Sequence, residues 1–271
     1  MEDTPENVWA PASGRLRGRG AVVTGAGRGL GRAIAWAFAR EGASVVVADI
    51  SGEEHETAQL IQREGGRAAP ARVDVTRRQD VQTLAARAVE TCGRVDILVN
   101  NAGVIVNKPF LEISEEEWEW QFDVITKGTY LCSQEIARGM AQRADGGRII
   151  NISSSGGRRP LAEESAYCAA KASVLMLTRV MALELAPYGI TANAVCPGMI
   201  DTEMLDKAFR EIARRRGVSA EAVKRAELLG VPLRRLGRPV DVAEACVYLA
   251  SDAAAYVTGA CIDITGGWML P

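Results

Sequence analysis

Three polar residues could act together on an oxygen atom of a substrate: Ser154, Tyr167 and Lys171. The segment 165–187 is rich in Ala, Leu and Met and is predicted to be a helix, where residues four apart share a face. Lys171 would then lie beside the Tyr167 hydroxyl and favour its phenolate form, since a nearby positive charge lowers a phenol pKa from about 10. Tyr167 could take a proton from an alcohol or return it to a carbonyl oxygen. Ser154 could hydrogen-bond the same oxygen.

A tyrosine followed four residues later by a lysine is weak evidence alone, so the elements around it matter. An apolar run at 21–23 is followed by a glycine turn, Thr-Gly-Ala-Gly-Arg-Gly-Leu-Gly, and then by a helical stretch at 32–41. Strand, glycine turn and helix form the context of a dinucleotide-binding loop, whose free N–H groups bind a pyrophosphate. No Lys-Ser or Lys-Thr follows the glycines, which argues against a P-loop NTPase.

The second apolar run ends in Asp49, about two dozen residues beyond the first glycine. An acidic residue at this position suits the ribose hydroxyls of NAD and repels the additional phosphate of NADP. Arg28 is the opposing signal, because it could reach that phosphate. We favour NAD, since Ile50 and Ser51 offer no second positive charge after Asp49.

The alternation of strands and helices continues along the chain. Further helices are predicted around 53–64, 78–92, 115–143 and 165–187, and further strands around 44–48, 68–73, 96–99, 148–152 and 191–195. Repeated β-α units of this length predict an α/β fold: a Rossmann-like, doubly wound parallel sheet with helices on both faces. A chain of 271 residues that is 48% hydrophobic suits one such domain. Ligands should collect at the carboxyl ends of the strands, where Asp74, Asn100, Ser154 and Pro197 fall.

Composition excludes several other classes of protein. The net charge is −2 with scattered basic residues, so we expect no nucleic-acid partner. The six cysteines occur singly and there is one histidine, which argues against a metal site and favours free thiols in a reducing cytoplasm. No run of eighteen apolar residues is present, so no membrane span is expected. Residues 1–17 are predicted to be a flexible N-terminal extension without the features of a signal peptide.

The motifs, taken in order, resemble those of classical short-chain dehydrogenases/reductases over residues 18–268. They are the glycine loop at 24–31, Asp74 before Val75, Asn100-Asn101-Ala102-Gly103, Ser154, Tyr167 with Lys171, Pro197-Gly198 with Thr202, and Gly266-Gly267. The resemblance implies that Ser154, Tyr167 and Lys171 are catalytic, that residues 203–232 form a substrate lid, and that the protein is a homotetramer. It also implies a set of cofactor-binding residues: Gly25, Arg28, Gly29, Leu30, Gly31, Asp49, Asp74, Val75, Asn101, Ala102, Gly103, Tyr167, Lys171, Pro197, Gly198, Ile200 and Thr202.

The sequence departs from the family at one position. A Val-Asn-Leu-Lys-Gly type segment carries the catalytic asparagine in the family, and the matching residues here are Val-Ile-Thr-Lys-Gly at 124–128. Ile125 therefore replaces an asparagine that supports a water-linked proton path to the lysine. Either main-chain carbonyls and Thr126 keep that water in place, or proton exchange is impaired. We expect activity to survive because the Ser-Tyr-Lys set is intact.

These observations favour an NAD(H)-dependent oxidoreductase that interconverts a small-molecule secondary alcohol and a ketone. One alternative is an NADP(H)-dependent ketoreductase of the 3-oxoacyl-carrier-protein reductase type, which Asp49 disfavours. A second alternative is a cofactor-binding regulator that has lost its chemistry, which only Ile125 supports. Glu163 and Glu164, just before the tyrosine helix, could bind polar groups of the substrate or favour the helix dipole as first-turn acids.

Overall fold

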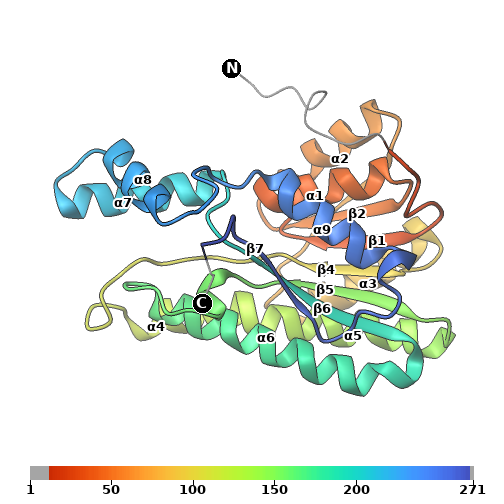
Figure 1. Cartoon of the computed structure of the whole chain (residues 1–271). Helices are drawn as coiled ribbons and strands as arrows, with labels where there is room; N and C mark the ends of the chain where they lie inside the picture. The colour runs from red at the N-terminus through yellow and green to blue at the C-terminus, as the bar shows by residue number, and fades with distance from the viewer. Residues whose placement is uncertain (1–11, 269–271) are drawn as a thin grey trace.

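Seven parallel strands form one sheet in the order β3-β2-β1-β4-β5-β6-β7 (Figure 1). The computed structural model describes residues 12–268. The strands are β1 (Gly20–Thr24), β2 (Ser44–Asp49), β3 (Arg67–Arg72), β4 (Ile97–Asn100), β5 (Gly147–Ile152), β6 (Ile190–Pro197) and β7 (Cys261–Ile264). The order reverses between β1 and β4, so the loops that follow these two strands diverge and leave a crevice at the carboxyl edge of the sheet.

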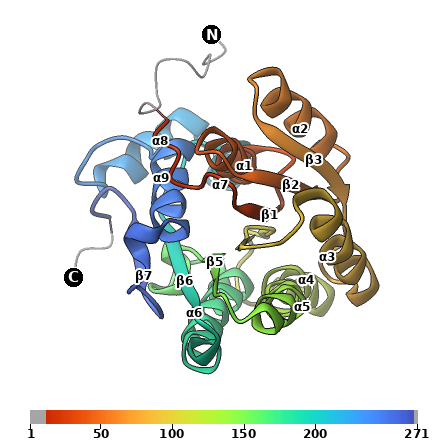
Figure 2. The ribbon, with the colours of Figure 1, turned by 90° about the vertical axis from the view of Figure 1, so that its right-hand side faces the viewer.

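Helices cover both faces of the sheet, as a doubly wound fold requires (Figure 2). One face is packed by α1 (Gly29–Arg40), α2 (Glu54–Arg63) and α9 (Pro239–Ala250). The other is packed by α3 (Arg78–Cys92), α5 (Gly128–Arg143) and α6 (Ser165–Leu185). Three further helices are α4 (Glu115–Phe122), α7 (Glu203–Arg216) and α8 (Ala220–Leu229). In Figure 1, α7 and α8 extend beyond the end of the sheet.

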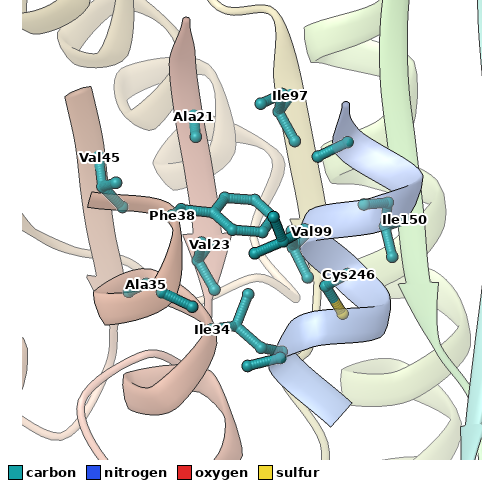
Figure 3. Packing of buried hydrophobic residues seen from close by; sticks show 14 of the residues in the cluster. Ala21, Val23, Ile34, Ala35, Phe38, Val45, Ile97, Val99, Ile150 and Cys246 are labelled. Atoms are coloured by element: carbon teal, nitrogen blue, oxygen red, sulfur yellow. The ribbon is translucent and has the colours of Figure 1, made fainter. Parts of the chain in front are cut away.

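The core between the sheet and α1 is built from alternate strand residues, because successive side chains of a strand point to opposite faces. Val23 of β1 and Ile97 of β4 face Phe38 of α1 and Cys246 of α9 in this cluster (Figure 3). Val22, the neighbour of Val23, belongs to the core on the opposite face. Both faces of the sheet are therefore buried, which explains why the strands read as continuous apolar runs rather than alternating ones.

The predicted fold class is confirmed, and most predicted elements are present within a few residues of their expected ends. The helix predicted at 115–143 differs, because a π-helical segment, Asp123–Lys127, separates α4 from α5. This segment contains Ile125, the residue that departs from the family pattern. The C-terminal region, for which no helix or strand was predicted, contains α9 and β7.

The expected flexible extension ends earlier than predicted. Leu16 is fully buried in the core under α1. Glu41, at the end of α1, accepts hydrogen bonds from the main-chain N–H groups of Ser13 and Arg15 at 3.2 and 2.9 Å and from the Arg15 guanidinium at 2.8 Å. These contacts fix residues 13–17 to the domain. The sequence does not predict this, because an isolated leucine gives no signal for where it packs. Residues 1–11 of the predicted extension lie outside the described residues.

Helix α6 is unusually apolar. By length and composition alone, the segment Ser165–Tyr188 could cross a membrane. Its inward face, however, packs against the sheet, with Ala170, Val174 and Ala182 all buried. Core helices of globular proteins pass the same test of length and composition. Burial therefore explains the apolar residues on the inward face of α6.

Candidate active site

A cleft of about 910 Å³ lies at the carboxyl edge of the sheet, where the strand order reverses. All of the residues predicted to act in catalysis or cofactor binding line this one cleft: Gly25, Arg28, Gly29, Leu30, Gly31, Asp49, Asp74, Val75, Asn101, Ala102, Gly103, Ser154, Tyr167, Lys171, Pro197, Gly198, Ile200 and Thr202. A smaller cavity of about 480 Å³ at the opposite edge holds none of them. Among residues 12–268, no group of three metal-ligating side chains is present.

The glycine loop between β1 and α1 is closed so tightly that side chains would not fit. Gly25 has a φ of +61°, in the left-handed region that favours glycine. A Cβ on Gly31 would lie 2.1 Å from the Gly25 carbonyl oxygen. Asn101 fixes the loop from β4, since its Nδ2 donates to the carbonyl oxygens of Thr24 and Gly25 at 3.0 and 2.9 Å. In this tightly closed loop, the free main-chain N–H groups at the start of α1 face the cleft, as pyrophosphate binding requires.

Asp49 lies at the end of β2 and faces this loop. Its Oδ2 accepts a hydrogen bond from the Gly27 N–H at 2.8 Å, and its Oδ1 accepts one from the Ser51 N–H at 2.9 Å. Arg28 is held between two acids, with its Nη1 3.6 Å from Glu53 Oε1 and 3.5 Å from Glu203 Oε2. The positive charge that could bind a 2′-phosphate is therefore already partly offset. The glycine loop and Asp49 together fit an adenine dinucleotide.

The opposite wall of the cleft begins where β6 ends. The Gly198 N–H donates to the Ile264 carbonyl of β7 at 3.0 Å, which fixes the turn after Pro197. Thr202 then begins α7, with its Oγ1 accepting from the Leu205 N–H at 3.4 Å. The predicted lid, 203–232, contains the helices α7 and α8 and begins directly after Thr202, which lines the cleft.

Ser154, Tyr167 and Lys171 meet at the centre of the cleft. Ser154 follows β5, and its hydroxyl accepts from the Gly156 N–H at 3.0 Å. Tyr167 and Lys171 project from the first two turns of α6, and Lys171 Nζ lies 5.7 Å from the centre of the Tyr167 ring. The Lys171 ammonium donates to the Ile152 carbonyl oxygen at 2.7 Å.

The expected lowering of the Tyr167 pKa is not present in this arrangement. Burial raises the pKa of Tyr167 to about 12, against the opposing effect of its hydrogen bond with Ser154. Burial also lowers the pKa of Lys171 to about 8. The physical reason is that both groups are removed from water while the ammonium bonds a carbonyl oxygen rather than the phenol.

Ile125 packs against the ring of Tyr167 and the first turns of α6. Its side chain is 1% exposed and packs with Ala170, Val174 and Tyr167. Its carbonyl oxygen accepts from Thr129 Oγ1 at 2.6 Å. Thr126 Oγ1 lies 2.8 Å from Ser173 Oγ. The Ile125 carbonyl and the Thr126 hydroxyl each keep a further acceptor site, so a water held by these groups stays a prediction.

Some lining residues were not predicted from the sequence, among them Asn107, Glu227, Trp120 and Trp268. Glu163 and Glu164, which the sequence offered as contacts for polar groups of a substrate, line the cleft as well. Asn107 and the two tryptophans carry no local motif and reach the cleft only through the tertiary fold.

The comparisons with known proteins agree with this geometry. The family model described as enoyl-(acyl carrier protein) reductase matches residues 25–269. The chain is 39% identical over 258 residues to oxidoreductase UcpA of Salmonella typhimurium, covering 95% of this chain and 97% of the relative. It is 38% identical over 257 residues to sorbitol dehydrogenase of Cereibacter sphaeroides, covering 94% and 99% of the two chains.

Among solved structures, a short-chain type dehydrogenase/reductase from Mycobacterium marinum superposes with a TM-score of 0.86 at 36% identity, covering 94% of this chain and 97% of that one. The chain belongs to the short-chain dehydrogenase/reductase family. It is an oxidoreductase whose family uses a nicotinamide cofactor, and its relatives indicate small-molecule substrates.

Proposed function

We propose that this protein is an NAD(H)-dependent dehydrogenase that interconverts a secondary alcohol and a ketone. The observation that carries the proposal is that Ser154, Tyr167 and Lys171 line the same cleft as the glycine loop and Asp49. The loop and Asp49 would hold a dinucleotide in the same cleft that Ser154 and Tyr167 line. The printed name of the relative from Cereibacter sphaeroides, a sorbitol dehydrogenase, supports alcohol oxidation.

In this proposal, Tyr167 is the general acid/base. It takes the hydroxyl proton of the alcohol during oxidation and returns a proton to the carbonyl oxygen during reduction. Ser154 donates a hydrogen bond to the same oxygen as charge develops on it. The nicotinamide accepts or supplies the hydride when it is bound. Lys171, 4% exposed, is the cation next to Tyr167 that favours its phenolate, and it would also hold the ribose of the nicotinamide.

The choice of NAD over NADP rests on charge. Asp49 is fixed by two main-chain hydrogen bonds at the position where ribose hydroxyls are bound, and its carboxylate repels a 2′-phosphate. Arg28 lies near Glu53 and Glu203, which weakens its attraction for that phosphate. The same charges disfavour the rival NADP-dependent ketoreductase. The regulator alternative loses support because Ile125 leaves the Ser-Tyr-Lys set in the cleft.

The test is to measure binding of NADH and NADPH to the purified protein, and then turnover of secondary alcohols with the preferred oxidised cofactor. We expect NADH to bind at least about tenfold more tightly and alcohol-dependent NADH formation to occur, since charge repulsion of a few kcal/mol suffices for such a ratio. Preference for NADPH would reject the cofactor assignment. Tight NADH binding without turnover on a broad panel would favour the regulator.

We also propose that the protein is a homotetramer that uses the outer face of α6. Met176, Val180 and Leu183 are 58%, 40% and 78% exposed, and their spacing places them along one stripe of the helix. A row of exposed apolar residues on a helix is typical of a surface that another subunit covers.

A further inference from the structure

Glu164 occupies an unusual place for an acid at a helix start. It is the N-cap residue of α6, but its side chain makes no capping hydrogen bond. The carboxylate is directed instead to Asn107, whose Nδ2 donates to Glu164 Oε1 at 3.1 Å. Both residues line the cleft, and Glu164 precedes Tyr167 by three residues on the same face of the helix. The Glu164 carboxylate therefore faces the cleft, close enough to Tyr167 to raise the pKa of that phenol.

The charge around Glu164 is not balanced by the protein. Glu163 is neutralised by Arg215, whose Nη2 lies 2.6 Å from its Oε2. Glu227 of α8 also lines the cleft and is close enough to Glu164 to raise the pKa of that carboxyl. None of the ion pairs among residues 12–268 includes Glu164 or Glu227. Among the basic residues of 203–232, Arg216 lines the cleft, and it is exposed to solvent.

The pKa of Glu164 reflects this environment. Burial raises it to about 7, the Asn107 hydrogen bond opposes that rise, and the nearby carboxylates of Glu227 and Glu163 add to it. A carboxylate in such a site is stabilised by a bound cation, which removes the charge repulsion and restores the ionised form. A bound anion would have the opposite effect.

The hydrogen-bonding groups near Glu164 also favour a positively charged ligand. One N–H of the Asn107 amide donates to Glu164 Oε1, which leaves the second Glu164 oxygen and the Glu227 carboxylate as acceptors. Trp120 and Trp268 line the same cleft, and aromatic rings attract cations. An ammonium group has three donors, no acceptor and a positive charge.

We propose that the substrate carries a protonated amine, which the Glu164 carboxylate binds while the reacting carbinol carbon lies at Tyr167. The inference rests on the proposed function, because it places the amine relative to an alcohol undergoing oxidation. Glu164 is thus a residue that determines specificity: amino alcohols and amino ketones are preferred to neutral analogues, and carboxylate-bearing analogues are rejected.

The test uses three alcohols that share a phenyl carbinol and differ in one group: 2-amino-1-phenylethanol, 1-phenylethane-1,2-diol and mandelate. Their kcat/KM values are measured with NAD for the wild type, for Glu164→Gln and for Glu221→Gln. The last variant removes an exposed carboxylate of α8 that does not line the cleft. We expect the order amine, diol, mandelate in the wild type. Loss of a charge-assisted hydrogen bond should lower the amine-to-diol ratio about 10- to 100-fold in Glu164→Gln, and Glu221→Gln should keep it.

A diol used as well as the amine, or an amine-to-diol ratio unchanged in Glu164→Gln, overturns the inference. Calorimetric titration of the amine into the protein with NADH bound separates this result from failure of the proposed function. Amine binding that depends on Glu164 without turnover of any alcohol supports the recognition and rejects the reaction. Turnover of the diol with no binding of the amine supports the reaction and rejects the recognition.

Discussion

The carboxylate of Asp49 accepts a 2.8 Å hydrogen bond from the main-chain N–H of Gly27, so the acid at the end of β2 is tied directly to the glycine loop. The loop therefore holds the carboxylate in a fixed direction before a cofactor binds. Fixed charges discriminate between ligands more sharply than mobile ones, because no ordering of the side chain opposes binding. The relationship links cofactor choice to the local fold of the loop.

From this relationship we predict that Asp49→Asn weakens NADH binding about tenfold. The ratio of NADH to NADPH affinity should fall by more than about tenfold, because removing the negative charge also removes the repulsion of the 2′-phosphate of NADPH. Fluorescence titration of both cofactors provides the measurement. Asp145→Asn, at the opposite edge of the sheet, is the matched control and should bind both cofactors as the wild type does. An unchanged NADH to NADPH ratio in Asp49→Asn would remove Asp49 from the account of cofactor choice.

A second prediction concerns Ile125, which is buried against Tyr167, Ala170 and Val174. Ile125→Val should lower the free energy of unfolding by about 1 kcal/mol through loss of one methylene, and should leave most of the activity. Ile125→Asn should lower it by roughly 2–4 kcal/mol, because an amide enters an apolar cluster. Urea denaturation followed by circular dichroism measures both. Equal stability of Ile125→Asn and the wild type would show that the segment can satisfy an amide at this position.

A third prediction concerns pH and the N-terminal segment. The pKa of Glu41 lies at about 2: burial alone would raise it, but hydrogen bonds from Arg15 and Ser13 and the charge of Arg15 outweigh burial. A carboxyl whose folded pKa is depressed contributes stability above its unfolded pKa, about 4.5 here, and loses it as the pH falls toward 2. The contribution at neutral pH is on the order of 2–3 kcal/mol.

Glu41→Gln should therefore be less stable than the wild type at pH 7, and the difference in unfolding free energy should shrink as the pH falls from 4.5 toward 2. Denaturant unfolding at a series of pH values gives the measurement. Glu244→Gln is a useful comparison, because Glu244 bonds the same Arg15 at 2.9 Å but is more exposed. A difference that stays constant across the acidic range would contradict the role assigned to the Glu41 carboxylate.

A fourth prediction concerns assembly. Leu183 is 78% exposed on the stripe of α6 proposed to contact another subunit. Leu183→Glu should shift the protein to a smaller assembly, because a charge placed in a buried apolar contact is not solvated. Sedimentation velocity distinguishes the species. Tyr256→Glu, at a fully exposed tyrosine on a different part of the surface, should leave the assembly unchanged. A Leu183→Glu protein of unchanged mass would place the interface elsewhere.

The sequence predicted the sheet and the main cleft because their signals are local. An apolar strand followed by a glycine turn and a helix specifies a β-α unit, and repetition of that unit specifies which strand ends come together. Gly25 and Gly31 were identified for the same reason: the turn they form needs residues without a Cβ.

Other features depend on contacts between distant residues and have no local signal. The Glu41 carboxylate bonds residues 26 and 28 positions earlier, which fixes a segment that composition alone marks as flexible. The Tyr167 pKa was predicted to fall because helix spacing puts Lys171 on the same face, yet spacing does not reveal burial or the competing Ile152 carbonyl. The position of Glu164 beside Asn107 likewise follows from the packing of a loop against α6.

The most direct test of the proposed function is the turnover of Tyr167→Phe with NAD and a secondary alcohol that the wild type oxidises. Removing the phenolic oxygen while keeping the ring retains the packing against Ile125 and removes the proton acceptor. We predict that kcat falls by about 10²- to 10⁴-fold while NADH affinity stays within about twofold of the wild type. Turnover close to that of the wild type, with cofactor binding intact, would contradict the assignment of Tyr167 as the general acid/base.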